Sequence, residues 1–175
     1  MKLGFYSGGH HEDNLEIDEA LINLSTNKDN IQYTFIPSHF HGSDQEFQEI
    51  MDHYRPLGIK KFLKLDVDSH YSSVLKRSVF NSDIIHLGGG NTYYFLKFLR
   101  KNKMLNELKK WVEDGGILTG LSAGAIIMTN NIDTAGFPHF DCDENEDNLR
   151  QFNSMNLVDF EFFPHYRNSK RYDED

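Results

Sequence analysis

Short apolar runs alternate with segments of helical spacing along most of this chain, and that alternation restricts the fold more than any other feature. We predict strands at 2–7, 32–36, 59–65, 83–87, 116–119 and 158–163, and helices at 15–24, 43–54, 72–80, 92–99, 105–112 and 125–128. A strand, a helix of about ten residues and a second strand are typical of a βαβ unit. Such units build a mostly parallel sheet that helices cover on both faces, so we expect a three-layer α/β sandwich.

Size and composition indicate one globular domain, 1–175. Hydrophobic residues make up 38% of the chain and charged residues 26%, which favours folding over disorder. The net charge of −9 argues against a surface that binds nucleic acid or an anionic membrane. No apolar run reaches the length of a membrane span, and the N-terminus resembles a strand rather than a signal peptide. Cys142 is the only cysteine, so an internal disulfide cannot form. We therefore expect a cytoplasmic protein.

The segment Gly120-Leu-Ser-Ala-Gly124 lies between the strand expected at 116–119 and the helix expected at 125–128. Gly-x-Ser-x-Gly in that position is typical of a nucleophile elbow, a tight turn that exposes the serine hydroxyl above the sheet. A side chain at either glycine would crowd the strand or the helix, and the N–H of Ala123 can donate to an oxyanion. We interpret Ser122 as a nucleophile; the alternative is a βα turn without a catalytic role.

The triple glycine Gly88–Gly90 follows another buried strand and precedes a helix that Asn91 or Thr92 can cap. Without Cβ atoms its backbone N–H groups can face a ligand. A phosphate cradle is weakly supported, because neither common nucleotide-binding glycine pattern is present. Two interpretations of the turn remain: it donates to an oxyanion formed at Ser122, or it only permits close packing. Both glycine motifs follow strand carboxyl ends, where α/β sheets form their sites.

Among nine histidines, His165 is the best candidate for a general base. A serine hydroxyl needs a base to remove its proton, and histidine titrates in a suitable range. His165 follows the nucleophile and comes just after the strand expected at 158–163, as a Ser…His order on an α/β scaffold requires. The alternative is a surface or structural histidine.

Other candidate sites are weaker. His10, His11 and Glu12 with His39 and His41 have the chemistry of a zinc site but not the spacing of one, so we expect no metal. The acidic segment 141–147 lacks the later glycine and glutamate of a calcium loop and is interpreted as solvated surface. Cys142 lacks the strand–turn–helix context of a nucleophile.

Taken together, the segments 84–92, 120–125 and 163–166 resemble the peptidase E family of serine peptidases, which is related to cyanophycinase and shares the flavodoxin-like fold of the glutamine-amidotransferase superfamily. The resemblance implies Ser122 as nucleophile, His165 as base and the amides of Gly90 and Ala123 as oxyanion hole, with no cofactor. It also implies hydrolysis of short peptides, for example dipeptides with an N-terminal aspartate, through an acyl-enzyme.

The sequence departs from the family pattern at its C-terminal end. Only ten residues follow His165, so the position of the family's acidic triad member and its last strands and helix are missing. The spacing between Ser122 and His165 is also longer, because of an insertion at 130–150. We expect a C-terminally truncated domain, weak or absent activity, and a homodimer through the open sheet edge. A binding module without activity is the alternative, whereas glutamine amidotransfer would need cysteine in place of Ser122.

Two further roles concern the residues after the histidine. Arg167 or Arg171, and less specifically Lys170, could bind a substrate carboxylate, although solvation at the surface is the plainer interpretation. Asp173 or Glu174 could approach His165, but their spacing does not argue for it.

Overall fold

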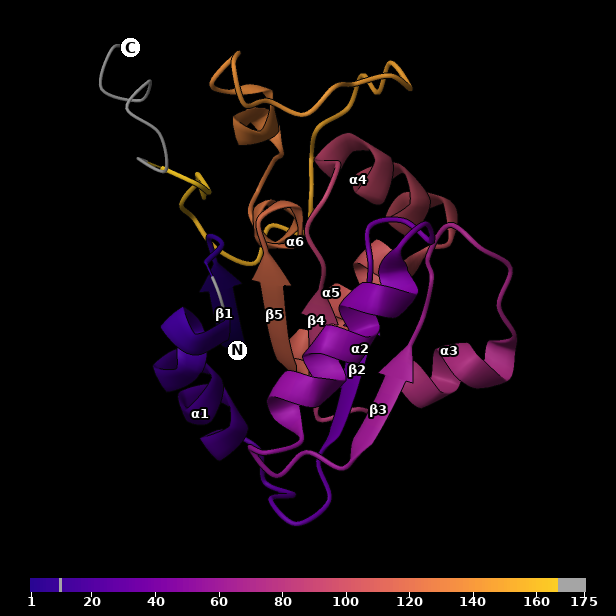
Figure 1. Cartoon of the computed structure of the whole chain (residues 1–175). Coiled ribbons are helices and arrows are strands. Elements are labelled where there is room, and N and C mark those ends of the chain that lie inside the picture. The colour runs from indigo at the N-terminus through magenta and orange to yellow at the C-terminus, as the bar shows by residue number, and fades with distance from the viewer. Residues whose placement is uncertain (10, 167–175) are drawn as a thin grey trace.

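The computed structural model describes residues 1–9 and 11–166, which form a sheet between two layers of helices (Figure 1). The strands are β1 (Lys2–Tyr6), β2 (Gln32–Ile36), β3 (Lys61–Lys64), β4 (Ile84–Leu87) and β5 (Ile117–Leu121). All neighbours are parallel, in the order β1-β5-β4-β2-β3. The α/β sandwich with a parallel central sheet that the alternation predicts is confirmed.

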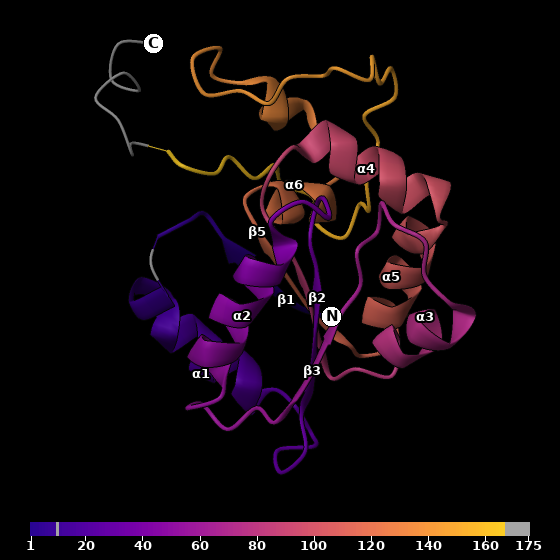
Figure 2. The same ribbon diagram turned by 45° about the vertical axis from the view of Figure 1, so that its right-hand side comes forward.

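The helices divide between the two faces of the sheet according to the direction in which the chain crosses it. Helices α1 (Leu15–Asn23) and α2 (Ser43–Tyr54) cover one face, and α3 (Ser73–Val79), α4 (Thr92–Lys101) and α5 (Met104–Glu113) cover the other (Figure 2). From β1 to β3 the chain moves one way across the sheet, and from β3 to β5 it moves back. Because parallel crossovers are right-handed, this reversal sends the later helices to the opposite face.

The loops that follow β2 and β4 therefore diverge from neighbouring strands toward opposite faces. In open α/β sheets this point of divergence, at the carboxyl ends of the strands, is where ligand sites form. The loop after β2 carries Ser38 and His39, and the loop after β4 carries Gly88–Gly90.

Two apolar layers hold the sandwich together, and the central strand β4 contributes to both. Ile85 and Leu87 face the layer formed with α4 and α5, while Ile84 faces the layer formed with α1 and α2. All four residues of β4 are buried, as expected for a strand covered on both faces. This packing fixes the position of the glycine turn that follows β4.

The N-termini of the helices are capped in different ways. Ser72 caps α3 by accepting a hydrogen bond from the N–H of Leu75 at 3.1 Å, and Asn91 caps α4 through the N–H of Tyr94 at 2.9 Å. Gly42, in a left-handed conformation, occupies the N-cap of α2, and the Ser43 hydroxyl donates to the Asp66 carboxylate at 2.9 Å.

The strand predicted at 158–163 is also wrong, because this segment pairs with no strand of the described sheet. Its alternating pattern has a different cause. Phe160 and Phe162 both pack on Phe5 of β1, with ring centroids 5.4 Å from the Phe5 ring. The backbone bonds elsewhere, since the carbonyl of Phe162 accepts from the Thr134 hydroxyl at 2.9 Å.

The segment between α6 (Ala123–Met128) and residue 157 forms a wall above the sheet that is tied to two helices. It contains a 3-10 helix, Asp133–Gly136. The N–H groups of Met155 and Leu157 donate to carbonyls of α6, each at 3.1 Å, and both side chains join the core. Arg100 of α4 donates to the carbonyls of Gln151, at 2.7 Å, and Asn153. The C-terminal part of this segment, residues 151–157, is thus packed against the domain.

No helix within the described ranges is long and apolar enough to cross a membrane.

Candidate active site

Ser122 lies on a strained turn between β5 and α6. Its backbone has φ 48° and ψ −108°, a conformation that non-glycine residues rarely adopt. A Cβ atom on Gly120 would lie 2.4 Å from the carbonyl carbon of Gly124, and one on Gly124 would lie 2.2 Å from the carbonyl oxygen of Leu87. Both glycines of the predicted elbow are therefore required by close backbone approach.

His165 reaches this turn from a distant part of the sequence. Its Nε2 atom lies 2.8 Å from Ser122 Oγ, within hydrogen-bonding distance, and both residues are half-buried. The separation is the one that a general base needs to take a proton from a hydroxyl nucleophile. The structure thus brings together the two residues that the sequence analysis chose, although His165 does not follow a strand as that analysis supposed.

The end of β1 holds His165 in place. The Ser7 hydroxyl accepts a hydrogen bond from the backbone N–H of His165 at 2.8 Å. The Gly8 Cα faces the imidazole, since a Cβ there would lie 3.2 Å from His165 Nδ1. His165 itself has φ 62°, so its position depends on these contacts rather than on regular secondary structure.

A buried carboxylate supports the same strand from below. The carbonyl of Tyr6 accepts the N–H of Ser122 at 2.9 Å, and the Tyr6 hydroxyl donates to Asp18 at 2.6 Å. Asp18, on α1 and only 2% exposed, also receives the Tyr54 hydroxyl at 2.6 Å and lies 2.7 Å from His53 Nε2. Burial, and next the neighbouring carboxylate of Asp18, raise the pKa of Tyr6.

The two expected oxyanion-hole residues lie at the same edge of the sheet. Among the hydrogen bonds of the described residues, none uses the backbone N–H of Gly90 or Ala123, so both groups are available to a ligand. Gly90 has φ 114°, and a Cβ on it would lie 2.2 Å from the buried Ser38 hydroxyl. Glycine is therefore needed at 90 for conformation and for space.

Ser122 and His165 open into a cavity of about 290 Å³. We call it the serine cavity; its lining residues come from the turns after β4 and β5, from α6 and from the 130–165 region: Gly90, Thr92, Ser122, Ile126, Thr134, Ala135, Phe137, Asp141, Cys142, Asp143, Pro164 and His165. Asp143 Oδ2 accepts the N–H of Thr92 at 2.7 Å, which anchors the wall to the start of α4. The acidic segment 141–147, expected to be plain surface, thus forms one side of the cavity.

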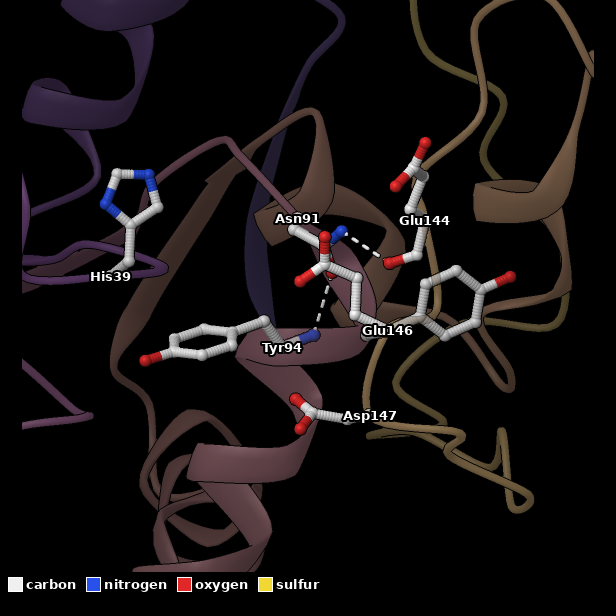
Figure 3. A pocket seen from close by; sticks show the side chains of 7 residues that line it. His39, Asn91, Tyr94, Glu144, Glu146 and Asp147 are labelled. Atoms are coloured by element: carbon white, nitrogen blue, oxygen red, sulfur yellow. Dashed lines mark hydrogen bonds between the residues drawn. The ribbon is translucent and has the colours of Figure 1, made fainter.

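A second cavity, of about 310 Å³, is lined by the later residues of the same segment, Glu144, Glu146 and Asp147. Figure 3 shows His39 and Tyr94 facing Glu144, Glu146 and Asp147 across it. The Asn91 amide, which lines this second cavity, donates a hydrogen bond to the Glu144 carbonyl at 2.8 Å (Figure 3).

Within residues 1–9 and 11–166, no carboxylate forms a hydrogen bond or an ion pair with His165; its polar contacts there are Ser122 and Ser7. The residues proposed for a substrate carboxylate, Arg167 and Arg171, and the acids Asp173 and Glu174 lie outside the described residues. No group of three or more potential metal-ligating side chains occurs in the described part of the chain.

The contact between Ser7 and His165 has no sequence motif. Ser7 lies 158 residues before His165, so their hydrogen bond is visible only in the structure. The sequence offers one general signal: Ser7 directly follows the carboxyl end of β1, the edge of the sheet where ligand sites form.

Comparison with known proteins identifies the family of the chain. Residues 4–174 match the model of peptidase family S51. An uncharacterised peptidase of Pasteurella multocida is 27% identical over 87% of this chain and 73% of its own length. An uncharacterised peptidase of Listeria monocytogenes is 30% identical, and a peptidase E of Shewanella denitrificans 33% identical, each over 61% of this chain. The matched regions span only 51% and 43% of those two relatives.

The fold has solved counterparts. The crystal structure of a candidate peptidase E protein from Listeria monocytogenes superposes with a TM-score of 0.79 at 24% identity, covering 99% of this chain and 85% of that one. A peptidase from an acI-B1 actinobacterium superposes with a TM-score of 0.68 at 17% identity. These likenesses concern the fold, while the family-model match covers nearly the whole sequence; the chain belongs to peptidase family S51.

Proposed function

We propose that this peptidase is of the serine type and hydrolyses short peptides through Ser122 and His165. The observation that carries the proposal is the 2.8 Å separation of Ser122 Oγ and His165 Nε2 on a strained elbow that opens into a cavity. Nε2 is placed to accept the hydroxyl proton as the oxygen attacks a peptide carbonyl.

The remaining steps follow from the same positions. The carbonyl oxygen becomes an oxyanion, to which the N–H groups of Gly90 and Ala123 donate. His165 then gives its proton to the leaving amine, the C–N bond breaks, and an ester to Ser122 remains. Water, deprotonated by His165, hydrolyses that ester and restores both side chains. The reaction uses only protein groups and water.

The direct test is labelling with a fluorophosphonate, which reacts with activated serines. We expect modification of the wild-type protein at Ser122 and none in Ser122→Ala. Ser69→Ala is a matched control, because Ser69 is exposed and its hydroxyl forms no hydrogen bond among the described residues. Labelling that survives in Ser122→Ala would contradict the proposal. Dipeptides with an N-terminal aspartate, which the family resemblance implies, are one substrate series for the accompanying hydrolysis assay.

A non-catalytic binding module is the second candidate. It is favoured by one observation: no described carboxylate contacts His165, and loss of the acid costs a triad enzyme about 10⁴-fold in turnover. Calorimetric titration with peptides, run beside the hydrolysis assay, separates the two functions. Binding without labelling or turnover would favour the module.

A further inference from the structure

The carboxyl end of β1 is attached to both residues of the proposed reaction. The Tyr6 carbonyl accepts the N–H of Ser122 at 2.9 Å, and the Ser7 hydroxyl accepts the N–H of His165 at 2.8 Å. The next residue, Gly8, lies against the imidazole, since a Cβ on it would be 3.2 Å from Nδ1. A shift of this strand end would therefore move His165 relative to Ser122, and a displacement of about 1 Å can cost about a hundredfold in rate.

The same end of β1 has few backbone restraints. The strand lies at one edge of the described sheet and pairs with β5 alone (Figure 1). Tyr6 is its last paired residue, opposite Leu121, and the Gly8-Gly9 turn that follows belongs to no strand. Ends of elements with few hydrogen bonds open more readily than the centre of a sheet. The position of this strand end therefore depends on the contacts of the Tyr6 side chain.

One buried carboxylate holds the Tyr6 side chain. The Tyr6 hydroxyl donates to Asp18 Oδ1 at 2.6 Å, and Asp18, on α1, is 2% exposed. From α2, the Tyr54 hydroxyl donates to the same oxygen at 2.6 Å, and His53 Nε2 lies 2.7 Å from Oδ2. Hydrogen bonds to a carboxylate are shorter and stronger than those between neutral groups. With both oxygens bonded, Asp18 ties the end of β1 to two helices.

Close packing is incomplete around these groups. A cavity of about 60 Å³ lies among Tyr6, Gly9, Asp18 and Tyr54, so packed atoms do not enclose the Tyr6 ring on every side. Its hydrogen bond to Asp18 is thus needed to fix its place. Buried charged groups are not required for stability as such, since apolar residues in their place are often as stable or more stable. What such a group can provide is one defined geometry, and here that geometry belongs to the strand end that holds the reactive pair.

We infer that Asp18 is a positioning residue for the proposed reaction: it holds the Tyr6 side chain and thereby keeps His165 in line with Ser122. The inference rests on the proposed function of Ser122 and His165, and it adds a residue that forms no hydrogen bond with either of them. If Asp18 only stabilised the fold, its loss would lower the free energy of unfolding without changing the reactivity of the folded protein.

Two conservative variants separate position from stability. Tyr6→Phe and Tyr54→Phe each remove one 2.6 Å hydrogen bond to Asp18 Oδ1, but only Tyr6 belongs to the strand that holds the reactive pair. We expect the rate of fluorophosphonate labelling at Ser122 to fall about five- to twentyfold in Tyr6→Phe and to stay within about twofold of wild type in Tyr54→Phe. Circular dichroism checks that both variants are folded in the assay. Equally fast or equally slow labelling of the two would overturn the inference.

Substitutions of Asp18 itself provide a rescue experiment. Asp18→Asn keeps an oxygen that can accept the Tyr6 and Tyr54 hydroxyls, whereas Asp18→Ala removes the acceptor. We expect the labelling rate of Asp18→Asn to stay within about threefold of wild type and that of Asp18→Ala to fall at least about tenfold. A wild-type labelling rate in folded Asp18→Ala would contradict the inference. If Asp18→Ala does not fold, the comparison of the two tyrosine variants decides.

The position of His165 can also be followed without its reactivity. The NMR signals of its ring nitrogens, assigned by their loss in His165→Ala, should shift in Tyr6→Phe and stay unchanged in Tyr54→Phe. If wild-type protein is not labelled, the proposed function fails, while a shift confined to Tyr6→Phe would still support the positioning. If Ser122 is labelled but neither the rate nor the signals change in Tyr6→Phe, the serine mechanism stands and the role of Asp18 is overturned.

Discussion

Adjacent glycines in the turn after β4 meet different surroundings. A Cβ on Gly90 would lie 2.2 Å from Ser38 Oγ, and the backbone there has φ 114°, which L residues rarely adopt. The nearest atom to a Cβ on Gly89 is a Leu121 side-chain carbon at 3.7 Å. We expect Gly90→Ala to lower the free energy of unfolding by about 2–4 kcal/mol and to slow fluorophosphonate labelling. Gly89→Ala should lose less than about 1 kcal/mol. Urea denaturation measures both; equal losses would contradict the distinction.

Ser7 positions the base by a single hydrogen bond to its backbone. Removing the hydroxyl in Ser7→Ala leaves His165 at φ 62° with one restraint fewer. We expect the labelling rate at Ser122 to fall about three- to tenfold, while the free energy of unfolding changes by less than about 1.5 kcal/mol. The comparison is Ser69→Ala, an exposed serine far from His165 in the sequence. A Ser7→Ala protein labelled at the wild-type rate would show that His165 is held by other contacts.

Among single residues, the sequence identifies those site candidates that belong to a recognisable motif. Ser122 and its flanking glycines were identifiable because the turn tolerates few residue types, and His165 because of chain order. Ser7 was not, since a serine after a strand has many possible roles. Its hydrogen bond joins it to His165, a residue distant in the sequence.

Among the elements, α1 makes an unusual contribution by burying a carboxylate beneath β1. In Asp18→Ala the hydroxyls of Tyr6 and Tyr54 lose their acceptor inside the core. We expect a loss of about 3 kcal/mol in the free energy of unfolding, measured by denaturant titration. Glu19→Ala, an exposed neighbour on the same helix, should change stability by less than about 0.5 kcal/mol. A comparable loss in both variants would argue that α1 itself, rather than the carboxylate, is sensitive.

The existence and type of most elements followed from the sequence, because strands buried on both faces and helices with one apolar side leave clear periodicities. The segment 158–163 did not follow that rule. Its alternation arises from Phe160 and Phe162 packing on one ring, which requires an extended backbone but no partner strand. The place of Asp141 and Asp143 in the wall of the serine cavity was also not predicted, because charge in a sequence does not reveal which carboxylates line a cavity.

For the whole molecule, the tyrosines around Asp18 predict a loss of stability in alkali. Burial is the main cause that raises the pKa of Tyr6, Tyr33 and Tyr54. Unfolded tyrosine loses its proton near pH 10 while the folded groups keep theirs, so the unfolded chain binds fewer protons and stability falls. The stabilisation is complete below about pH 10 and is lost as the pH rises above it toward the raised values.

Denaturant titrations between pH 8 and about 11 should therefore give a constant free energy of unfolding and then a decline. Tyr54→Phe removes one of the three groups and should make that decline shallower. The same slope in both proteins would contradict a role for Tyr54.

Both reactive groups are fastened to the first strand of the chain. The carbonyl of Tyr6 receives the N–H of Ser122, and the Ser7 hydroxyl receives the N–H of His165, 158 residues away. A growing polypeptide therefore carries the serine well before the histidine that would activate it has been synthesised. Contacts of such long sequence separation are slow to form. Under the proposed mechanism, the nucleophile stays inert through synthesis and folding and becomes reactive when the last segment closes on the first.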